Sequence, residues 1–419
     1  MNIGIIGSGG REHSLCFKLK ESKLVKKIFC FPGNAGTETI AENINLDITD
    51  FEKIHKTCEQ KKIELVIVGP EKPLVDGIVE YFKNTKIKIF GPDKISSQLE
   101  GSKTFTKKLC KKYKIPTSNF EIFNEEELAL NYLSSIQYPI VVKADGLAAG
   151  KGVYICKNQD DAKKAVKEIF GGRFGKADCV LIEEFLNGEE MSYFIISDGE
   201  THKFFQTAQD HKRVGENDTG KNTGGMGAYS PSRLYTNDLD KKINEKIIQP
   251  TLNGIKELGS NYSGFLYIGL MIVKNEPYLI EFNVRMGDPE CQTILPILDT
   301  DLAEIILACC NKKLQDIDIK WKNKKSVCIV LCSNGYPESY KKNIIINGLK
   351  NLKIDRDEYI FHAGTAIKDD KYLAIGGRVL NVIVTTENFK NSKDKAIKIL
   401  NDLDWKGGFF RKDIAYKVT

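Results

Sequence analysis

The chain has 419 residues, of which 41% are hydrophobic and 28% charged, and its formal net charge is +6. This composition is typical of a globular protein and excludes a disordered or fibrous chain. Because one hydrophobic core rarely serves more than about 250–300 residues, the length predicts about three domains.

Charge patterning and apolar runs exclude two classes of partner. Basic and acidic residues are interspersed, and the densest basic cluster is predicted to lie on an exposed helix: Lys107, Lys108, Lys111, Lys112 and Lys114. Without a localised basic surface carrying aromatic side chains, we expect no nucleic-acid partner. No segment reaches the roughly 18 consecutive apolar residues of a membrane span, so we expect no membrane partner.

The eleven cysteines and the N-terminus indicate the compartment. The cysteines are scattered, contain no Cys-x-x-Cys pair and are predicted to be buried thiols in a reducing environment. The N-terminus begins with a strand and a glycine turn and lacks the basic segment and cleavage site of a signal peptide. We therefore expect a cytoplasmic protein.

Residues 1 to about 100 alternate short apolar strands with amphipathic helices, which predicts an α/β domain with a doubly wound parallel sheet. Gly9 and Gly10 follow the first strand at a helix N-terminus, which suits an anion such as a sugar phosphate. Glu12 stands where a dinucleotide-binding Gly-x-Gly-x-x-Gly motif needs its last glycine, so NAD binding is disfavoured. The predicted strands are Asn2–Ile6, Lys27–Phe31, Leu65–Val68 and Ile87–Phe90.

A glycine-rich loop joins two further predicted strands. The first strand carries Lys143 near its end, and the loop that follows contains Gly150, Lys151 and Gly152 before the strand Val153–Cys156. Small residues let backbone N–H groups approach an anion, and lysines add positive charge. The pattern predicts a phosphate-covering hairpin, and it is not a Walker A loop because the loop runs from strand to strand.

Two segments farther along are candidate ligand contacts. Cys179 to Glu190 reads as a buried strand that runs into an acidic turn, which could hold an adenine against main-chain groups and a ribose against Glu190. Gly220 to Gly227 is a polar loop too poor in side chains to pack, so it favours wrapping a ligand.

The most informative segment is Glu281-Phe-Asn283-Val-Arg285-Met-Gly-Asp288-Pro-Glu290. Residues i and i+2 of a strand share a face, so Glu281 and Asn283 present a carboxylate and an amide oxygen to one spot, with Arg285 on the same face. Mg²⁺ beside phosphates is bound through a few such oxygens, and a guanidinium can bind a further anion. From about residue 325 the predicted elements are the strands Ser326–Leu331 and Arg378–Thr385 and a helix near Lys393–Asp402, which indicate a small α+β domain.

In this order, the lysine strand, glycine loop, acidic strand and Glu-x-Asn strand resemble the ATP-grasp superfamily. Further blocks resemble the phosphoribosylamine–glycine ligase family, also called glycinamide ribonucleotide synthetase, over almost the whole chain. These blocks are Gly7-Ser-Gly-Gly-Arg-Glu-His13, Pro32-Gly-Asn-Ala-Gly36, Val68-Gly-Pro-Glu71-Lys-Pro-Leu74, Gln209-Asp-His-Lys-Arg213, Asn222-Thr-Gly-Gly-Met-Gly-Ala-Tyr-Ser-Pro231, Arg285-Met-Gly-Asp-Pro-Glu290, His362-Ala-Gly-Thr365, Gly376-Gly-Arg-Val379 and Phe410-Arg-Lys-Asp413.

The resemblance implies a Rossmann-like N-terminal domain at residues 1–101, an ATP-grasp domain at 102–324 with a lid subdomain at about 115–190, and a C-terminal domain at 325–419. It implies that ATP, with Mg²⁺ or Mn²⁺, converts glycine to glycyl phosphate. The amine of 5-phosphoribosylamine then displaces phosphate and gives glycinamide ribonucleotide in purine biosynthesis. A monomer that dimerises weakly at most is expected.

The resemblance also implies roles for individual residues. Glu281 and Asn283 would bind the metal, and Arg285, Lys143 and Asp288 would act on the reacting groups, with Gly287 beside the glycine amine. ATP would contact Lys103, Lys143, Gly150, Lys151, Gly152, Glu183, Glu184, Leu186 and Glu190. The acceptor would contact Asp210, Lys212, Arg213, Gly224 and Gly225, and its phosphate would contact Gly9, Gly10 and Asn34.

Two alternatives remain open on the sequence. Another ATP-grasp ligase could act on a different acid or acceptor, and a nucleotide-binding sensor could share the fold without catalysis. The retention of Glu281, Asn283, Lys143 and Arg285 disfavours the sensor. Departures from the family pattern are Lys221 for proline, Ser333-Asn334 for small residues and Ala415-Tyr416 for Gly-Trp, and none falls on a predicted metal or phosphate ligand.

Overall fold

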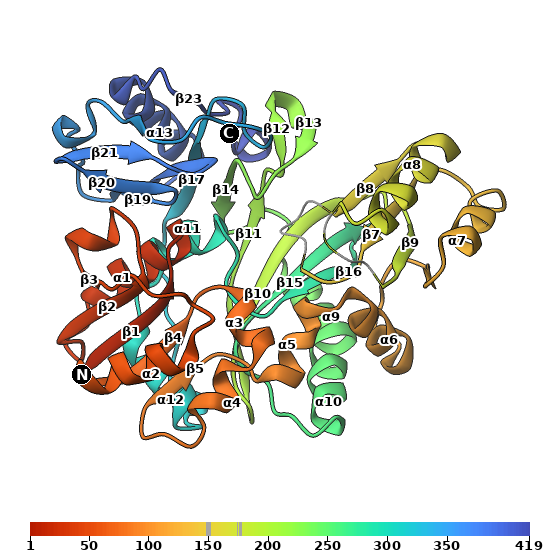
Figure 1. The fold of residues 1–419 in the computed structure, drawn as a ribbon, viewed down its shortest axis with the longest axis horizontal. Helices are drawn as coiled ribbons and strands as arrows, with labels where there is room; N and C mark the ends of the chain where they lie inside the picture. The colour runs from red at the N-terminus through yellow and green to blue at the C-terminus, as the bar shows by residue number, and fades with distance from the viewer. Residues whose placement is uncertain (148–151, 174, 176–177) are drawn as a thin grey trace.

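The structure is a computed structural model that describes residues 1–147, 152–173, 175 and 178–419. Three parts lie around the green and teal strands: the N-terminal part in red and orange, a projecting yellow lid, and the blue C-terminal part (Figure 1).

The N-terminal part is a parallel sheet with the strand order β3-β2-β1-β4-β5. This confirms the predicted doubly wound sheet, and each predicted strand lies within about two residues of an observed one. The strands are β1 (Asn2–Gly7), β2 (Lys27–Pro32), β3 (Glu42–Asn43), β4 (Ile63–Val68) and β5 (Lys88–Phe90). The helices are α1 (Gly10–Lys20), α2 (Phe51–Gln60), α3 (Glu71–Asp76), α4 (Ile78–Phe82) and α5 (Lys94–Gly101), with a 3₁₀ turn η1 (Thr37–Thr39).

A large antiparallel sheet forms the centre of the molecule, and its order in the described part of the chain is β16-β15-β10-β11-β14-β17-β22-β19, with β23 beside β17. The strands are β10 (Glu189–Asp198), β11 (His202–Asp210), β14 (Gly227–Ser230), β15 (Ser263–Val273), β16 (Glu276–Asn283), β17 (Lys325–Ser333), β19 (Glu358–His362), β22 (Arg378–Thr386) and β23 (Gly408–Phe409). Since β14 pairs with β17, the boundary proposed at 324/325 separates two strands of one continuous sheet.

The lid is an antiparallel sheet with the order β6-β9-β7-β8 and two helices. Its elements are β6 (Phe120–Phe123), α7 (Glu126–Tyr132), β7 (Ile140–Ala144), β8 (Val153–Cys156), α8 (Gln159–Phe170) and β9 (Val180–Glu184). Lys143 pairs with Val153 across β7 and β8, which confirms that the glycine-rich segment joins two antiparallel strands.

The remaining elements link and cover the sheets. Helices α6 (Lys103–Tyr113), α9 (Asn237–Ile243), α10 (Gln249–Glu257), α11 (Glu290–Ile294), α12 (Leu302–Cys310) and α13 (Phe389–Leu403) are joined by the helical turns η2 (Glu216–Asp218), η3 (Asn244–Ile248), η4 (Leu295–Ile297), η5 (Leu314–Asp316), η6 (Leu349–Asn351) and η7 (Tyr416–Val418). Strands β12 (Arg213–Gly215) and β13 (Thr219–Asn222) form a hairpin, and β18 (Ile344–Ile345), β20 (Thr365–Lys368) and β21 (Lys371–Ala374) form a small sheet.

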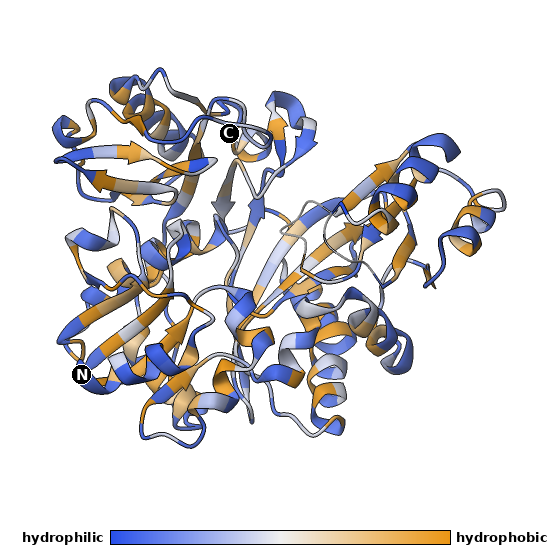
Figure 2. Ribbon diagram, in the orientation of Figure 1, coloured by the Kyte–Doolittle hydropathy of each residue, from blue (hydrophilic) through white to orange (hydrophobic). Residues whose placement is uncertain are grey.

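Apolar residues concentrate in the sheets and on the inner faces of the helices (Figure 2). In the part of the chain that the structure describes, four clusters of buried side chains lie within and between the three parts. All eleven cysteines are free thiols, and ten of them are buried as the sequence predicted, whereas Cys310 is partly exposed. Among the described residues, no helix is long and apolar enough to cross a membrane.

Candidate active site

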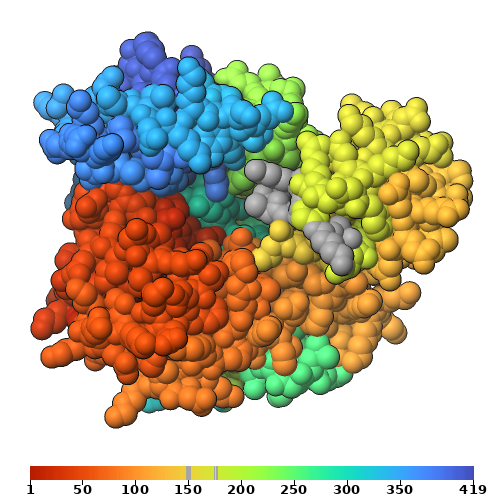
Figure 3. Space-filling model, viewed as in Figure 1, coloured from red at the N-terminus to blue at the C-terminus, as the bar shows by residue number. Residues whose placement is uncertain are grey.

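A cleft of about 680 Å³ lies where the three parts meet. Figure 3 shows the surface hollowed between the N-terminal part, the C-terminal part and the lid. Most of the predicted site residues line this cleft: Lys103, Lys143, Gly152, Glu183, Glu184, Leu186, Glu190, Asp210, Lys212, Arg213, Gly224, Glu281, Asn283, Arg285, Gly287 and Asp288.

The predicted metal ligands lie at the end of β16. An irregularity in the pairing with β15 sets Glu281 opposite Gly269, and Asn283 follows two residues later on the same face. With its amide assigned so that the nitrogen faces acceptors, Asn283 donates to Glu100 at 3.0 Å and to the Phe282 carbonyl at 3.1 Å, and the amide oxygen points the other way.

This pair of oxygens fits a divalent cation. Glu281 has neither a hydrogen bond nor an ion pair within the described residues, so its carboxylate is available in the cleft. In that same part of the chain, no group of three or more His, Cys, Asp and Glu residues could hold a metal by itself. A cation that completes its shell with water and substrate phosphates needs only such a small protein contribution.

Arg285 is held between two carboxylates. Its Nη2 donates to Glu100 at 2.6 Å and its Nε donates to Glu71 at 3.2 Å. Burial raises the pKa of Glu100 to about 7, with Glu71 adding repulsion and Arg285 opposing the shift. Burial also disfavours the charge of Glu71, but Arg285 and Arg11 outweigh it and lower that pKa to about 2. The guanidinium is therefore fixed in place and stays charged.

Lys143 belongs to a buried cluster around Glu183. The Glu183 Oε2 atom accepts from Lys143 at 2.9 Å and from Ser118 at 2.8 Å, and Lys107 Nζ lies 3.3 Å away. Burial opposes the negative charge of Glu183, but the two lysines outweigh it and hold its pKa below the usual range. Its Oε1 atom is buried and has no hydrogen-bond partner in the described structure, so it can accept a donor from a ligand.

Lys107 corrects the prediction of a uniformly exposed lysine helix. Its side chain is 3% exposed and donates to Thr117 at 2.6 Å and to Ser118 at 3.0 Å, whereas Lys108, Lys111, Lys112 and Lys114 are exposed as predicted. The helix turns one face to β9 and the opposite face to solvent, and lysine spacing alone does not reveal which face Lys107 occupies.

Lys103 lies at the first turn of α6 and donates to the Gly146 carbonyl at 2.8 Å. This contact attaches the start of the glycine-rich loop to the helix that carries Lys107. The predicted phosphate contacts Gly150 and Lys151 lie outside the described residues, while Gly152 lines the cleft.

The predicted acceptor residues follow the end of β11. Lys212 pairs with Glu190 at 2.5 Å, and the Lys212 carbonyl accepts from the Thr223 N–H at 2.8 Å. Burial raises the pKa of Asp210 to about 7, with Lys212 opposing the shift and nearby carboxylates supporting it. Asp210 can therefore exchange a proton near neutral pH.

Asp288 lines the cleft beside Arg378 of the C-terminal part. Its Oδ1 atom accepts from Gln292 at 2.6 Å and lies 3.2 Å from Arg378. Burial opposes its charge, but Arg378 and Arg11 lower the pKa below the usual value. Arg378 also donates to the Gly224 carbonyl at 2.6 Å, which joins the C-terminal part to the loop that carries Gly224.

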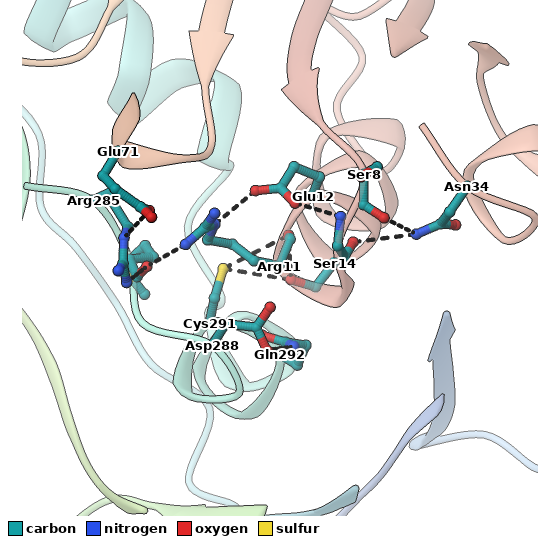
Figure 4. Close-up of polar contacts among 12 residues, drawn as sticks. Ser8, Arg11, Glu12, Ser14, Asn34, Glu71, Arg285, Asp288, Cys291 and Gln292 are labelled. Carbon is teal, nitrogen blue, oxygen red and sulfur yellow. Dashed lines mark hydrogen bonds and ion pairs between the residues drawn. The ribbon is translucent and has the colours of Figure 1, made fainter. Parts of the chain in front are cut away.

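Four predicted residues do not belong to the residues that line the cleft: Gly9, Gly10, Asn34 and Gly225. The Gly9 N–H donates to Glu12 at 2.6 Å, and a side chain at Gly10 would collide with Asn381 and Gln292. Asn34 Nδ2 donates to the carbonyls of Ser8, Gly9 and His362, so Asn34 holds the turn that carries Gly9. Figure 4 shows its contact with Ser8. A phosphate contact at these residues remains a prediction.

The sequence reasoning gave no role to several charged residues that line the cleft, among them Arg11, Glu71, Glu100, Lys107 and Arg378. Arg11 pairs with Glu12 at 2.6 Å and donates to the Met286 carbonyl at 3.3 Å (Figure 4). All except Glu100 and Lys107 lie inside blocks already quoted for the family resemblance. For Arg11, Glu71 and Arg378, the signal in the sequence was therefore a charged residue close to glycines in a block that resembles the family. That signal gave these residues no specific role.

Comparison with known proteins identifies this arrangement. Family models match the N domain of phosphoribosylglycinamide synthetase at residues 1–100, its ATP-grasp (A) domain at 101–291 and its C domain at 326–417. Phosphoribosylamine–glycine ligase of Haemophilus influenzae is 47% identical over 424 aligned residues, which cover 100% of this chain and 99% of that protein. The chain belongs to the phosphoribosylamine–glycine ligase family. It is therefore an ATP-dependent ligase.

Solved structures agree with this family membership. The crystal structure of phosphoribosylamine–glycine ligase from Thermotoga maritima has a TM-score of 0.86 and 33% identity, and the match covers 99% of this chain and 100% of that one. A biotin carboxylase complex from Campylobacter jejuni has a TM-score of 0.75 at 17% identity and covers 98% of this chain and 93% of that one, which shows the shared fold alone. The predicted family, fold class and ligase activity are confirmed.

Proposed function

We propose that this chain joins glycine to 5-phosphoribosylamine at the expense of ATP, giving glycinamide ribonucleotide, ADP and phosphate for purine biosynthesis. The observation that carries the proposal is that one cleft is lined by Lys143, Glu281, Asn283, Arg285 and Asp288. The family membership supplies the substrates.

In the first step, an oxygen of the glycine carboxylate attacks the γ-phosphorus of ATP, the bond to the β-phosphate oxygen breaks, and glycyl phosphate and ADP form. Both reactants are anionic, so positive charge must lie between them. Lys143 and Arg285 supply that charge, and Glu71 and Glu100 fix the Arg285 guanidinium in position. Catalysis then rests on positioning and charge neutralisation, without a protein nucleophile.

In the second step, the amine of 5-phosphoribosylamine attacks the carbonyl carbon of glycyl phosphate, and inorganic phosphate leaves. The amine nitrogen must lose a proton as the amide forms. Asp210, whose pKa is raised to about 7, lines the cleft beside Lys212 and is our candidate acceptor for that proton. Asp288, which remains ionised, is our candidate partner for the glycine ammonium.

We assign the nucleotide and metal contacts from oxygen atoms that are available to accept, on Glu183, Glu281 and Asn283. Glu183 Oε1 is our candidate acceptor for an adenine amino group, with Glu184 and Leu186 beside the base and Glu190 near the ribose. Glu281 and Asn283 would hold Mg²⁺, or Mn²⁺ in its place, which would neutralise phosphate charge when bound. We further propose that the chain acts in the cytoplasm as a monomer and without a nucleic-acid partner.

The test is an assay of ADP release with ATP, Mg²⁺ and 5-phosphoribosylamine generated in place, with glycine present or omitted. We expect ADP only when glycine and the amine are both present, and we expect Glu281→Ala to lower kcat by at least about a hundredfold. Glu276→Ala is the matched control, because Glu276 lies on the same strand and pairs with Lys242 and Lys246 at the surface. Equal turnover with another carboxylic acid or acceptor would instead favour a different ATP-grasp ligase.

A further inference from the structure

The block Phe410-Arg-Lys-Asp413 near the C-terminus lies outside the roles assigned above, although its arginine is among the most deeply buried side chains. Arg411 is 1% exposed. Its Nε and Nη2 atoms donate to the two carboxylate oxygens of Asp413 at 2.8 and 2.7 Å. This bidentate pair leaves the Nη1 atom of Arg411 for contacts outside its own segment.

Nη1 of Arg411 contacts the hairpin formed by β12 and β13. It donates to the Arg213 carbonyl at 2.8 Å and to the Asp218 carboxylate at 2.9 Å. Two further contacts attach the same hairpin, since the Asn217 N–H donates to Asp413 at 2.8 Å and the Lys412 N–H donates to Glu216 at 3.2 Å. The segment 411–413 therefore holds both the base and the tip of the hairpin.

The hairpin and the residues around it form one wall of the cleft: Lys212, Arg213, Asp218, Asn222, Thr223 and Gly224. Both neighbours of Lys212 are attached to the C-terminal segment. The Ala415 N–H donates to His211 Nε2 at 3.0 Å, and Arg411 binds the carbonyl of Arg213. The backbone of Lys212 thus lies between two residues that the C-terminal segment binds, and its side chain pairs with Glu190 in the cleft.

We infer that Arg411 is a positioning residue for the acceptor side of the active site. It acts through the β12–β13 hairpin and Lys212 and does not line the cleft itself. The inference rests on the proposed function for its substrate assignment. Without Arg411, the Arg213 carbonyl and the partly exposed carboxylates of Asp218 and Asp413 lose their shared donor, so the C-terminal segment holds the hairpin wall less firmly.

The first measurement is independent of activity. Lys212, Arg213 and Lys221 are trypsin sites in or beside the hairpin, and we expect Arg411→Met to increase cleavage there at least about tenfold over wild type. Arg356→Met is the matched control because Arg356 is an exposed arginine of the C-terminal part and does not line the cleft. Unchanged cleavage of the hairpin in Arg411→Met would overturn the anchoring.

The second measurement is the KM of each substrate in the full ligase reaction. We expect Arg411→Met to raise the KM for 5-phosphoribosylamine about tenfold while the KM for ATP stays within about twofold. Asp413→Asn leaves Nη1 able to bind the Arg213 carbonyl, so the KM should rise less, and this variant decides the question if Arg411→Met does not fold. An equal change for all substrates, or no change, would overturn positioning. Absence of ligase activity in the wild type would contradict the proposed function while leaving the proteolysis result valid.

Discussion

At the residue scale, two consecutive lysines of α6 show how burial changes the meaning of a charge. Lys107 pairs with Glu183 inside the protein, whereas Lys108 is exposed on the outer face of the same helix. Burial lowers the pKa of Lys107, and Glu183 opposes that shift. The buried ammonium persists because Glu183, Thr117 and Ser118 replace the water that it loses.

We expect Lys107→Met to destabilise the protein by about 2–4 kcal/mol. The substitution removes one of the two cations beside the buried Glu183 carboxylate and leaves Lys143 as its remaining cation. The measurement is urea-induced unfolding at neutral pH. Lys108→Met is the matched control on the same helix and should change stability by less than about 0.5 kcal/mol. Equal stabilities of the two variants would show that the Lys107–Glu183 pair contributes nothing net.

The same scale separates what could be predicted at the site from what could not. Glu281 and Asn283 were predictable because strand alternation puts residues i and i+2 on one face. Glu71 and Glu100 were not, since each approaches Arg285 from a distant part of the chain. Local spacing carries no information about such long-range pairs.

At the element scale, the predicted strands match those observed because buried strands are short apolar runs bounded by turn residues. The C-terminal helix was predicted near Lys393–Asp402 but begins at Phe389. The missed signal is Asn388, whose side chain accepts from the Asn391 N–H as an N-cap. The polar first turn hid the start of the helix from a search for apolar periodicity.

Helix α1 meets strand β19 through two buried histidines. His13 Nδ1 accepts from the His362 N–H at 2.9 Å, and the ring centroids are 5.7 Å apart. Burial lowers the pKa of His13 to about 3, assisted by repulsion from His362, and burial lowers that of His362 to about 4. Both imidazoles are therefore neutral in the folded protein at neutral pH.

This junction should make stability fall in mild acid. The folded pKa values lie below the unfolded value of about 6.5, so the stability is complete above that value and is lost as pH falls toward 4 and 3. Between pH 7 and 5 we expect a loss of about 1–2 kcal/mol per histidine. The measurement is urea unfolding across that range, and His362→Gln should show a shallower pH dependence than wild type. His55→Gln is the control and should keep the pH dependence of wild type. If the stability of His362→Gln varied with pH as steeply as that of wild type, the assignment would be contradicted.

At the scale of the whole molecule, the central sheet unites segments that family models treat as separate domains. Strand β14 pairs with β17 from Gly227↔Ile329 to Ser230↔Ser326, and all four β14 residues are buried. The cleft depends on this union because Arg378 and Lys417 reach its wall from the C-terminal part. The boundary at 324/325 therefore separates two segments of the chain that share one sheet.

We expect a chain that ends at residue 324 to aggregate. It would expose the edge of β14, and Met226 and Tyr229 would lose the C-terminal side chains that bury them. Size-exclusion chromatography with urea unfolding is the measurement, with the full chain as control. A truncated chain that remains monomeric and unfolds cooperatively would show that the β14–β17 pairing is dispensable for folding.

The sequence by itself determined the family, the doubly wound N-terminal sheet and the strand that bears Glu281 and Asn283. These features depend on local periodicity and on motifs that are contiguous in the chain. Only the tertiary structure decided that Lys107 is buried, that Glu71 and Glu100 hold Arg285, and that Arg411 anchors the hairpin beside Lys212. These contacts join residues far apart in sequence, and a charge acquires its partner and its pKa only when folding removes it from water.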